Sequence, residues 1–371
     1  MSRLAITVDG IEFENPFLLG SGPPGTNARV IGKAYKAGWG GVVAKTTALT
    51  DTEVVNVTPR YEKLKSPGGE VVGFQNIELI SDRPFEDWEV DFRSLKHEFP
   101  KKVLIASIME SFDKSRWQEI AARCEATGVD GLELNFSCPH GHPERGMGAA
   151  MGQDPERVET VTRWVTDVVD IPVWAKMTPN ITDVRLPARA SLDGGANGVA
   201  AINTILSVIG VNTDTLRPLP TVEGHSVPGG YSFIGAKPVG LRMVKEIAES
   251  LPQLSISGIG GVATSRDAFE FVLLGSSTVQ VCTAAMLNGL NIIEELTSGL
   301  ENYLEQHGFE KLEHAVGHSL QYFTTHHDLV AKQSERRQEK ARARASRDLA
   351  WGEMDLASTT SAMTSTETKS P

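Results

Sequence analysis

The chain has 371 residues and a formal net charge of −11 at pH 7. This length allows one large barrel or two smaller domains, and the negative charge argues against nucleic acid or an anionic membrane as the main partner. The three cysteines show no CxxC spacing, so we expect no disulfide framework, iron–sulfur cluster or metal site in this chain. No apolar run resembles a signal peptide or a membrane span, and we expect a cytoplasmic protein.

Short apolar runs recur along the chain, and each is followed by a segment with helical periodicity. A small hairpin over residues 3–14, turning at Asp9-Gly10, precedes them and is expected to plug one end of the fold. The expected strands cover residues 17–20, 41–46, 103–108, 131–136, 173–177, 198–203, 254–259 and 278–283. The expected helices cover residues 33–38, 117–128, 155–169, 183–194, 238–251, 264–275 and 292–304, with a less distinct one within 85–99.

Eight strand-then-helix units are the number that closes a (β/α)8 TIM barrel. Parallel strands buried on both faces explain why the runs are continuously apolar. An open, doubly wound sheet is the alternative fold. A barrel predicts that polar and glycine residues with chemical roles lie at the carboxyl ends of the strands, where the two longest connections, residues 47–84 and 204–237, also begin.

The end of the chain differs in composition from the rest. Residues 332–348 carry seven basic and three acidic side chains, and the sequence becomes rich in serine and threonine after Trp351. We therefore divide the chain into a catalytic barrel (1–308), a helical basic extension (309–350) and a disordered tail (351–371). A solvated charged helix is the simplest interpretation of the basic run, and partner docking is the alternative.

Cys138 follows the fourth predicted strand and precedes a segment rich in glycine. A thiol has an ordinary pKa only one or two units above neutrality, so at such a hinge it could swing to a ligand and exchange a proton. The alternative is a small apolar residue at a strand end.

Two lysines and two glycines are candidates for binding an anionic ligand at the rim of the barrel, which is formed by the carboxyl ends of the strands. Lys45 and Lys176 end the second and fifth strands and could stabilise negative charge on a reduced flavin, although either could simply emerge into water. Gly260-Gly261 follows the seventh strand and Thr283 ends the eighth, the pair of loops that commonly holds a phosphate in barrels. A phosphate site alone would also suit a non-redox barrel enzyme.

Amide side chains offer both donors and acceptors to a ring with alternating N–H and C=O groups. Asn76, Asn135 and Asn203-Thr204 are all expected at the rim, and Glu78 could accept from a ring N–H. Each asparagine alone could equally be a turn or strand-end cap.

Several motifs, in this order, resemble the flavin-and-pyrimidine barrel domain of dihydropyrimidine dehydrogenases, within the dihydroorotate dehydrogenase superfamily. The resemblance covers about residues 4–305. The motifs are Asn15-Pro-Phe, Ala44-Lys-Thr, Asn76-Ile-Glu-Leu-Ile, Glu133-Leu-Asn-Phe-Ser-Cys-Pro-His-Gly, Glu144-Arg-Gly-Met-Gly, Gly152-Gln-Asp-Pro, Ala175-Lys-Met-Thr-Pro-Asn, Asn203-Thr and Val279-Gln-Val-Cys-Thr.

The resemblance implies a non-covalent FMN and reduction of the 5,6 double bond of uracil or thymine, or the reverse oxidation. It implies that Cys138 is the general acid that protonates C5 while hydride passes between flavin N5 and C6. The implied flavin contacts are Ser21, Lys45, Lys176, Gly260, Gly261, Cys282 and Thr283. The implied pyrimidine contacts are Asn76, Glu78, Asn135, Asn203 and Thr204.

Three features separate this chain from parts of that superfamily. His140 stands where dihydroorotate dehydrogenases usually have an asparagine that helps to bind the substrate carboxylate, which favours a neutral pyrimidine ring. No cysteine follows Cys282, so electrons from NAD(P)H are expected through a partner, such as an FAD and iron–sulfur subunit. Phe233 falls near a position where a glycine is expected to approach the flavin.

A dihydroorotate dehydrogenase-like enzyme and a non-catalytic electron-relay flavoprotein are the alternatives that follow from the same resemblance. Whichever of these functions the protein has, we expect it to form a homo-oligomer.

Overall fold

The computed structural model describes residues 2–51, 54–136, 149–349 and 355–364. The chain divides into two compact units, Met1–Leu320 and Gln321–Pro371. Cys138 and His140 lie outside the described residues.

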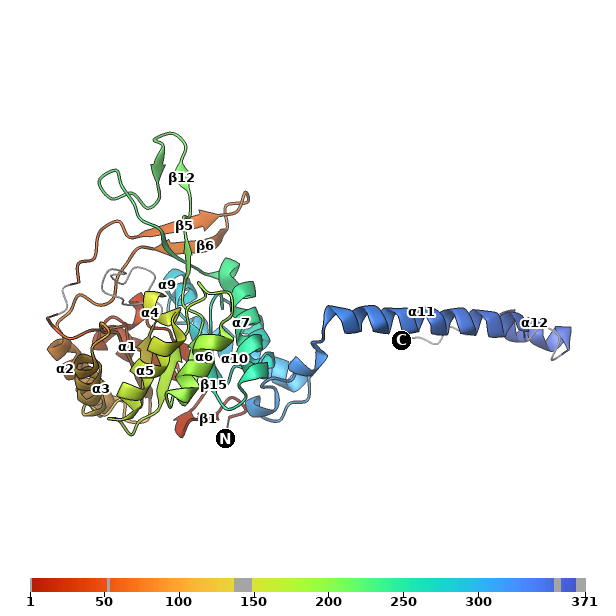
Figure 1. Ribbon diagram of the computed structural model, residues 1–371, viewed down its shortest axis with the longest axis horizontal. Coiled ribbons are helices and arrows are strands. Elements are labelled where there is room, and N and C mark those ends of the chain that lie inside the picture. The colour runs from red at the N-terminus through yellow and green to blue at the C-terminus, as the bar shows by residue number, and fades with distance from the viewer. Residues whose placement is uncertain (1, 52–53, 137–148, 350–354, 365–371) are drawn as a thin grey trace. The chain divides into compact units, whose positions relative to one another are not determined.

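Eight parallel strands form a closed barrel in the order of the sequence, which confirms the predicted TIM barrel (Figure 1). Every residue of these strands is buried except for two half-buried ones at the ends of β15, which accounts for their mainly apolar sequences. The barrel strands are β3 (Phe17–Leu19), β4 (Gly41–Val43), β7 (Val103–Ile108), β8 (Gly131–Asn135), β9 (Val173–Lys176), β10 (Gly198–Ala201), β15 (Ser255–Ile259) and β16 (Thr278–Val281).

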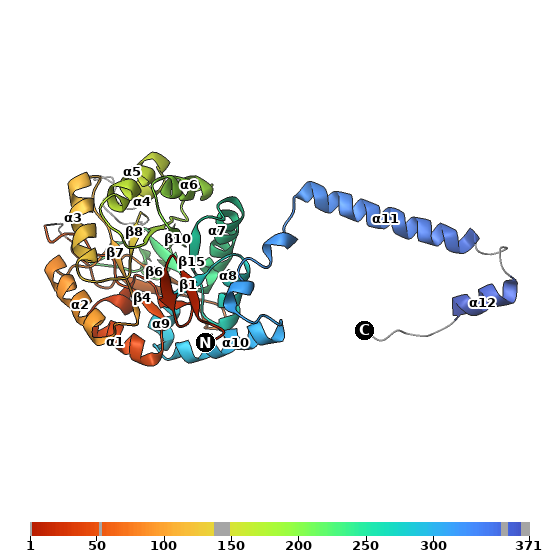
Figure 2. The same ribbon diagram turned by 90° about the horizontal axis from the view of Figure 1, so that it is seen from below.

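Helices surround the barrel in the view from below (Figure 2). Their start and stop signals are local: Asn27 caps α1 by accepting from the Val30 N–H, and Thr264 and Asp267 form a capping box at α8. The helices are α1 (Ala28–Ala37), α2 (Phe85–Glu98), α3 (Lys114–Glu125), α4 (Ala149–Gly152), α5 (Pro155–Thr166), α6 (Arg185–Asp193), α7 (Lys237–Ser250), α8 (Ser265–Leu273), α9 (Thr283–Asn288) and α10 (Ile292–Gln306). The less distinct prediction over residues 85–99 is α2, which buries Phe85, Trp88, Phe92 and Leu95.

The predicted N-terminal hairpin consists of β1 (Ile6–Val8) and β2 (Ile11–Phe13). Its turn residue Asp9 accepts hydrogen bonds from Trp174 Nε1 at 2.7 Å and from Ser255 Oγ at 2.5 Å. These partners lie near the amino ends of β9 and β15, so the hairpin covers that end of the barrel, and the chemistry is left to the opposite rim (Figure 2).

A four-stranded antiparallel sheet stands where the sequence predicted two long connections. β5 (Tyr61–Lys65) and β6 (Val71–Asn76) come from the connection after β4, and β11 (Ile205–Ser207) and β14 (Gly229–Ser232) come from the connection after β10. The strand order is β11-β14-β6-β5, so the two connections are hydrogen-bonded to each other through β14 and β6. The short pair β12 (Val211–Asn212) and β13 (Arg217–Pro218) also belongs to the second connection (Figure 1).

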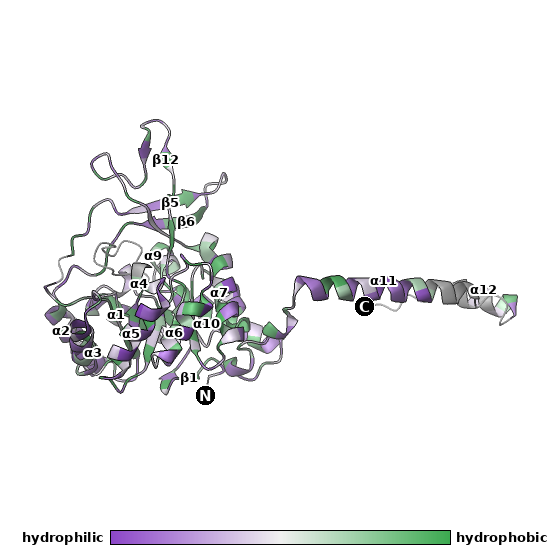
Figure 3. Ribbon diagram, in the orientation of Figure 1, coloured by the Kyte–Doolittle hydropathy of each residue, from purple (hydrophilic) through white to green (hydrophobic). Residues whose placement is uncertain are grey.

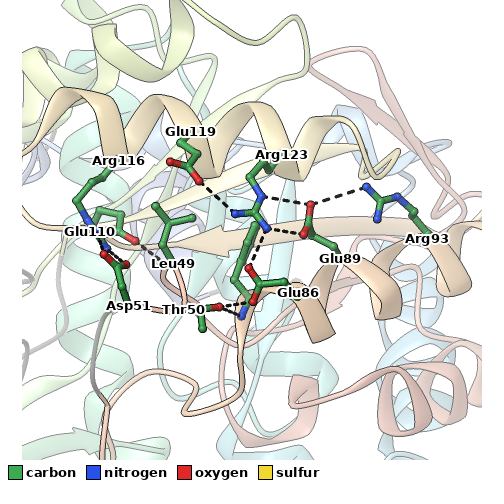
Figure 4. Close-up of polar contacts among 11 residues, drawn as sticks. Leu49, Thr50, Asp51, Glu86, Glu89, Arg93, Glu110, Arg116, Glu119 and Arg123 are labelled. Carbon is green, nitrogen blue, oxygen red and sulfur yellow. Dashed lines mark hydrogen bonds and ion pairs between the residues drawn. The ribbon is translucent and has the colours of Figure 1, made fainter.

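A buried carboxylate fixes the start of the first long connection (Figure 4). Glu110, with a fully buried side chain, accepts from the Leu49 N–H at 2.6 Å and from Arg116 Nε at 2.7 Å. The Arg116 guanidinium also forms a bidentate pair with Asp51, at 2.7 and 2.8 Å. These contacts hold residues 49–51 next to the start of α3, and the chain then continues to β5.

The barrel unit extends beyond residue 308, where we expected its end. Leu312 and Ala315 are fully buried, and the Leu312 N–H donates to the Arg3 carbonyl at 3.0 Å. In the second unit, α11 (His326–Leu349) carries mostly hydrophilic residues (Figure 3). Within the tail predicted to be disordered, Leu356–Thr364 form α12. None of the described helices is long and apolar enough to cross a membrane.

Candidate active site

One cavity at the carboxyl ends of the barrel strands brings together the predicted residues that the structure describes. β6 and β14 of the four-stranded sheet also contribute side chains to its wall. The predicted residues that line it are Ser21, Lys45, Asn76, Glu78, Asn135, Lys176, Asn203, Thr204, Gly260, Gly261, Cys282 and Thr283. Cys138, the predicted proton donor, lies outside the described residues. The individual roles of all thirteen stay predictions.

The first of the two lysines is paired with a carboxylate. Lys45 Nζ lies 2.9 Å from Glu78 Oε2, and each side chain is 8% exposed. Arg60 approaches the other Glu78 oxygen at 3.5 Å. Burial and the nearby Glu78 raise the pKa of the Tyr61 phenol above its ordinary value. Arg60 and Tyr61 were not identified from the sequence.

The second lysine is held in a buried network inside the barrel. Lys176 Nζ lies 3.1 Å from Glu133 Oε1, and the two side chains are 3% and 0% exposed. Ser21 Oγ donates to the same Glu133 oxygen at 2.9 Å, and Gln280 Nε2 donates to Oε2 at 2.9 Å. We did not single out Glu133 or Gln280 from the sequence, although polar residues in strands flanked by apolar ones were an available signal.

The amides form a chain of hydrogen bonds across the rim. Asn203 Nδ2 donates to Asn135 Oδ1 at 3.4 Å, and Asn135 Nδ2 donates to Thr46 Oγ1 at 2.9 Å. Thr46 Oγ1 and Ser107 Oγ lie 2.8 Å apart. In the four-stranded sheet, Asn76 Nδ2 donates to the Gly230 carbonyl at 3.3 Å, a contact that depends on the pairing of β6 with β14. These contacts orient the carboxamides that line the cavity.

The loops after β15 and β16 bring backbone close to the cavity. Gly260 and Gly261 have φ values of +127° and +84°, and a Cβ on Gly261 would lie 2.7 Å from the backbone nitrogen of Lys237. Ser232 and Thr283 join the loops after β10 and β16 through their hydroxyls, 2.9 Å apart. The backbone of these loops, the Thr283 hydroxyl, two ammonium groups and several amides line the same cavity, a donor set that fits a phosphate-bearing heterocycle.

Two residues of this wall have unusual local chemistry. Burial raises the pKa of the Cys282 thiol to about 11, with Lys176 and Lys45 opposing the shift, so the thiol is neutral near pH 7. Phe233, near a position where the resemblance led us to expect a glycine, lines the cavity with φ +75° and ψ −165°, a backbone conformation that favours glycine.

Comparisons with known proteins agree with this architecture. The dihydroorotate dehydrogenase family profile matches residues 3–304. The chain is 52% identical over 342 residues to dihydropyrimidine dehydrogenase (NADP(+)), chloroplastic, from Arabidopsis thaliana, covering 90% of this chain and 80% of the relative. It is 42% identical over 316 residues to NAD-dependent dihydropyrimidine dehydrogenase subunit PreA from Escherichia coli K12, covering 85% and 76%.

A more distant relative and a solved structure extend the same comparison. The chain is 35% identical over 319 residues to the catalytic subunit of dihydroorotate dehydrogenase B (NAD(+)) from Pyrococcus abyssi, covering 85% of this chain and 99% of the relative. The crystal structure of Eimeria tenella DHODH in complex with ferulenol has a TM-score of 0.72 at 20% identity, covering 85% and 88% of the two chains, and supports the fold. The chain therefore belongs to the dihydroorotate dehydrogenase family and is an oxidoreductase that acts on CH–CH bonds.

Proposed function

We propose that this protein binds FMN without a covalent bond and reduces the 5,6 double bond of uracil or thymine, or catalyses the reverse oxidation. The observation that carries the proposal is the single cavity in which two ammonium groups, three asparagines and the Gly260-Gly261 turn converge. Similarity to two proteins named dihydropyrimidine dehydrogenase supports this substrate class.

FMN bound in this cavity would supply hydride transfer between its N5 atom and C6 of the pyrimidine. Lys45 and Lys176 would hold the ring system of the cofactor, with Ser21 and Cys282 beside it. The backbone at Gly260 and Gly261 and the hydroxyl of Thr283 would hold its phosphate.

The pyrimidine would be oriented by the amide groups and by Glu78. Asn76, Asn135, Asn203 and Thr204 line the cavity and present donors and acceptors suited to the ring N–H and C=O groups. Cys138 would donate a proton to C5 during reduction and remove it during oxidation.

The proposal predicts a yellow protein that loses turnover, but keeps its flavin, when Cys138 is replaced. For C138A we expect uracil reduction and dihydrouracil oxidation to fall by about 10²- to 10⁴-fold, the usual contribution of a positioned acid or base. C124A is the matched control, because Cys124 is buried in α3 away from the cavity. Undiminished turnover by C138A would refute the assignment of the proton donor, and a protein that binds no FMN would refute the proposed function.

Dihydroorotate is the competing substrate, since the family profile and the Pyrococcus abyssi relative carry that name. Assays of uracil, thymine, dihydrouracil and dihydroorotate with the same preparation separate the two. Preference for dihydroorotate would overturn the pyrimidine assignment while keeping the flavin. Binding of FMN with no turnover of any of these, with any donor or acceptor, would favour an electron-relay subunit.

We propose that electrons come from NAD(P)H through a partner subunit that carries FAD and iron–sulfur clusters. We also propose that the protein is cytoplasmic and that the chain forms a homo-oligomer. Two of the relatives are named as subunits, which supports a partner. Purification from native cells followed by mass spectrometry tests the partner, and light scattering tests the oligomer.

A further inference from the structure

The carboxylate of Glu133 is fully buried in the barrel interior and is surrounded by donors. It accepts from Lys176 Nζ at 3.1 Å, from Ser21 Oγ at 2.9 Å and from Gln280 Nε2 at 2.9 Å. Gln280 also donates to Ser257 Oγ at 3.1 Å, so side chains from strands β8, β9, β15 and β16 and from Ser21, the second residue after β3, all meet at this group. These contacts place three side-chain donors around one carboxylate in the barrel interior.

Glu133 differs from the other carboxylate that pairs with a lysine in this region. Glu78 lines the cavity together with Lys45, whereas Glu133 is not among the cavity-lining residues. Its three partners Lys176, Ser21 and Gln280 all line the cavity. Glu133 can therefore influence a ligand through these side chains without touching it.

The pairing changes the electrostatic role expected for Lys176. An unpaired ammonium next to a flavin would favour its reduced, more negative state. A carboxylate 3.1 Å from the ammonium offsets much of that field at a site beyond the pair. Together with Ser21 Oγ at 3.2 Å and Gln280 Oε1 at 3.4 Å, it holds the Lys176 ammonium in place.

We propose that Glu133 is a positioning residue that lowers the reduction potential of the bound flavin by offsetting the charge of Lys176. This inference rests on the proposed function, because it requires a flavin in the cavity. It assigns a role to a residue that contacts neither cofactor nor substrate.

The test is a redox titration of the flavin-loaded protein, with electrons supplied by xanthine through xanthine oxidase and a reference dye in the same cuvette. For E133Q, the ratio of reduced to oxidised flavin at a fixed potential should rise about tenfold, which is about 30 mV for a two-electron couple. The double variant E133Q/K176Q, which removes both charges, should return toward the wild-type potential. E133D keeps the charge and should shift the potential less than E133Q.

E110Q is the matched control. Glu110 is also fully buried and ion-paired, with Arg116 at 2.7 Å, but neither residue lines the cavity. The E110Q substitution should lower the stability of the protein and leave the reduction potential of the flavin unchanged.

If the reduction potential of the flavin in E133Q equals that in the wild type, the inference is overturned. An equal shift in E110Q would also overturn it, because it would show that the loss of a buried ion pair away from the cavity changes the potential as much. If E133Q does not fold, K176Q and E133Q/K176Q are compared instead: the flavin potential should be higher in the double variant, which lacks the Glu133 charge, and equal potentials would overturn the inference. If the wild-type protein binds no flavin, the proposed function and this inference are both wrong. If the wild-type protein binds flavin but E133Q has the same flavin potential, only the inference is wrong.

Discussion

Phe233 is a residue at which local conformation and side-chain type disagree. Its φ of +75° and ψ of −165° lie in a region that only glycine enters freely, and holding another residue there costs about 1–3 kcal/mol. Its carbonyl oxygen would lie 2.8 Å from a Cβ on Gly261, so the two loops pack closely at this point. The sequence indicated this position because a glycine was expected there, and the backbone has the conformation of a glycine.

Comparing two truncations of Phe233 separates the backbone from the ring. F233A and F233G both remove the ring, but F233G also relieves the backbone. We expect F233G to be more stable than F233A by about 1 kcal/mol, the reverse of the usual order of these residues. Urea denaturation of the two variants measures the difference in free energy of unfolding. A lower stability of F233G would show that the positive φ carries no cost.

The pKa of Cys282 gives a prediction for pH dependence. Burial raises it from 9.0 to about 11, so between these values the folded protein keeps a proton that the unfolded chain releases. The contribution of this thiol to stability therefore falls as the pH rises from about 9 to about 11. In a C138A background, alkylation of Cys282 by iodoacetamide, followed by peptide mass spectrometry, should accelerate up to about pH 11. A plateau near pH 9 would contradict the shift.

The pairing of the two lysines could not be predicted from the sequence. Lys176 and Glu133 are 43 residues apart, and Lys45 meets Glu78 through a connection that contains β5 and β6. Sequence position placed both lysines at the rim because each follows an apolar strand. Which charge lies opposite each lysine depends on barrel closure and on the path of a long loop, and neither leaves a local pattern.

At the scale of elements, the ion pairs of Arg116 with Glu110 and Asp51 help to hold the connection between β4 and α2 (Figure 4). In R116A, the buried Glu110 loses its cation, and we expect a loss of about 2 kcal/mol, below the usual cost for a fully buried pair because Arg116 is 22% exposed. R123A is the matched control, because Arg123 pairs with Glu86 and Glu119, whose side chains are more than half exposed, and with Glu89. Its loss should stay below about 1 kcal/mol. Equal losses in guanidinium denaturation would show that the Glu110 pair is not special.

Burial on both faces explains which strands the sequence could predict. The eight barrel strands are mostly apolar and almost completely buried, and all eight predicted runs contain the observed strands. β5 and β11 are half-buried or exposed and β6 and β14 are only partly buried, so each of these strands combines apolar residues with polar ones at half-buried or exposed positions. The sheet above the rim was therefore predicted only as long connections.

At the scale of the whole molecule, the buried core fixes where the barrel unit ends. Buried apolar residues extend to Ala315, beyond the boundary at residue 308 that composition suggested. Segment 309–320 bonds back to the barrel unit: the Gly317 and Ser319 N–H groups donate to the Val272 and Leu273 carbonyls, each at 3.0 Å or less. Composition could not show this, because one buried leucine and a few backbone bonds do not make a periodic pattern.

Two truncations test this boundary. A chain ending at Leu320 keeps every buried core residue and the closing pair of β16 with β3, and the described side chains of α11 are exposed apart from the half-buried Asp328. We expect it to unfold at the same temperature as the full chain and to keep its flavin. A chain ending at Gly308 lacks Leu312, whose burial is worth about 2–5 kcal/mol, and should melt several degrees lower. Calorimetry compares the three chains. If both truncations melt alike, segment 309–320 adds nothing to the core; if the Leu320 truncation melts well below the full chain, the second unit is required for the stability of the barrel.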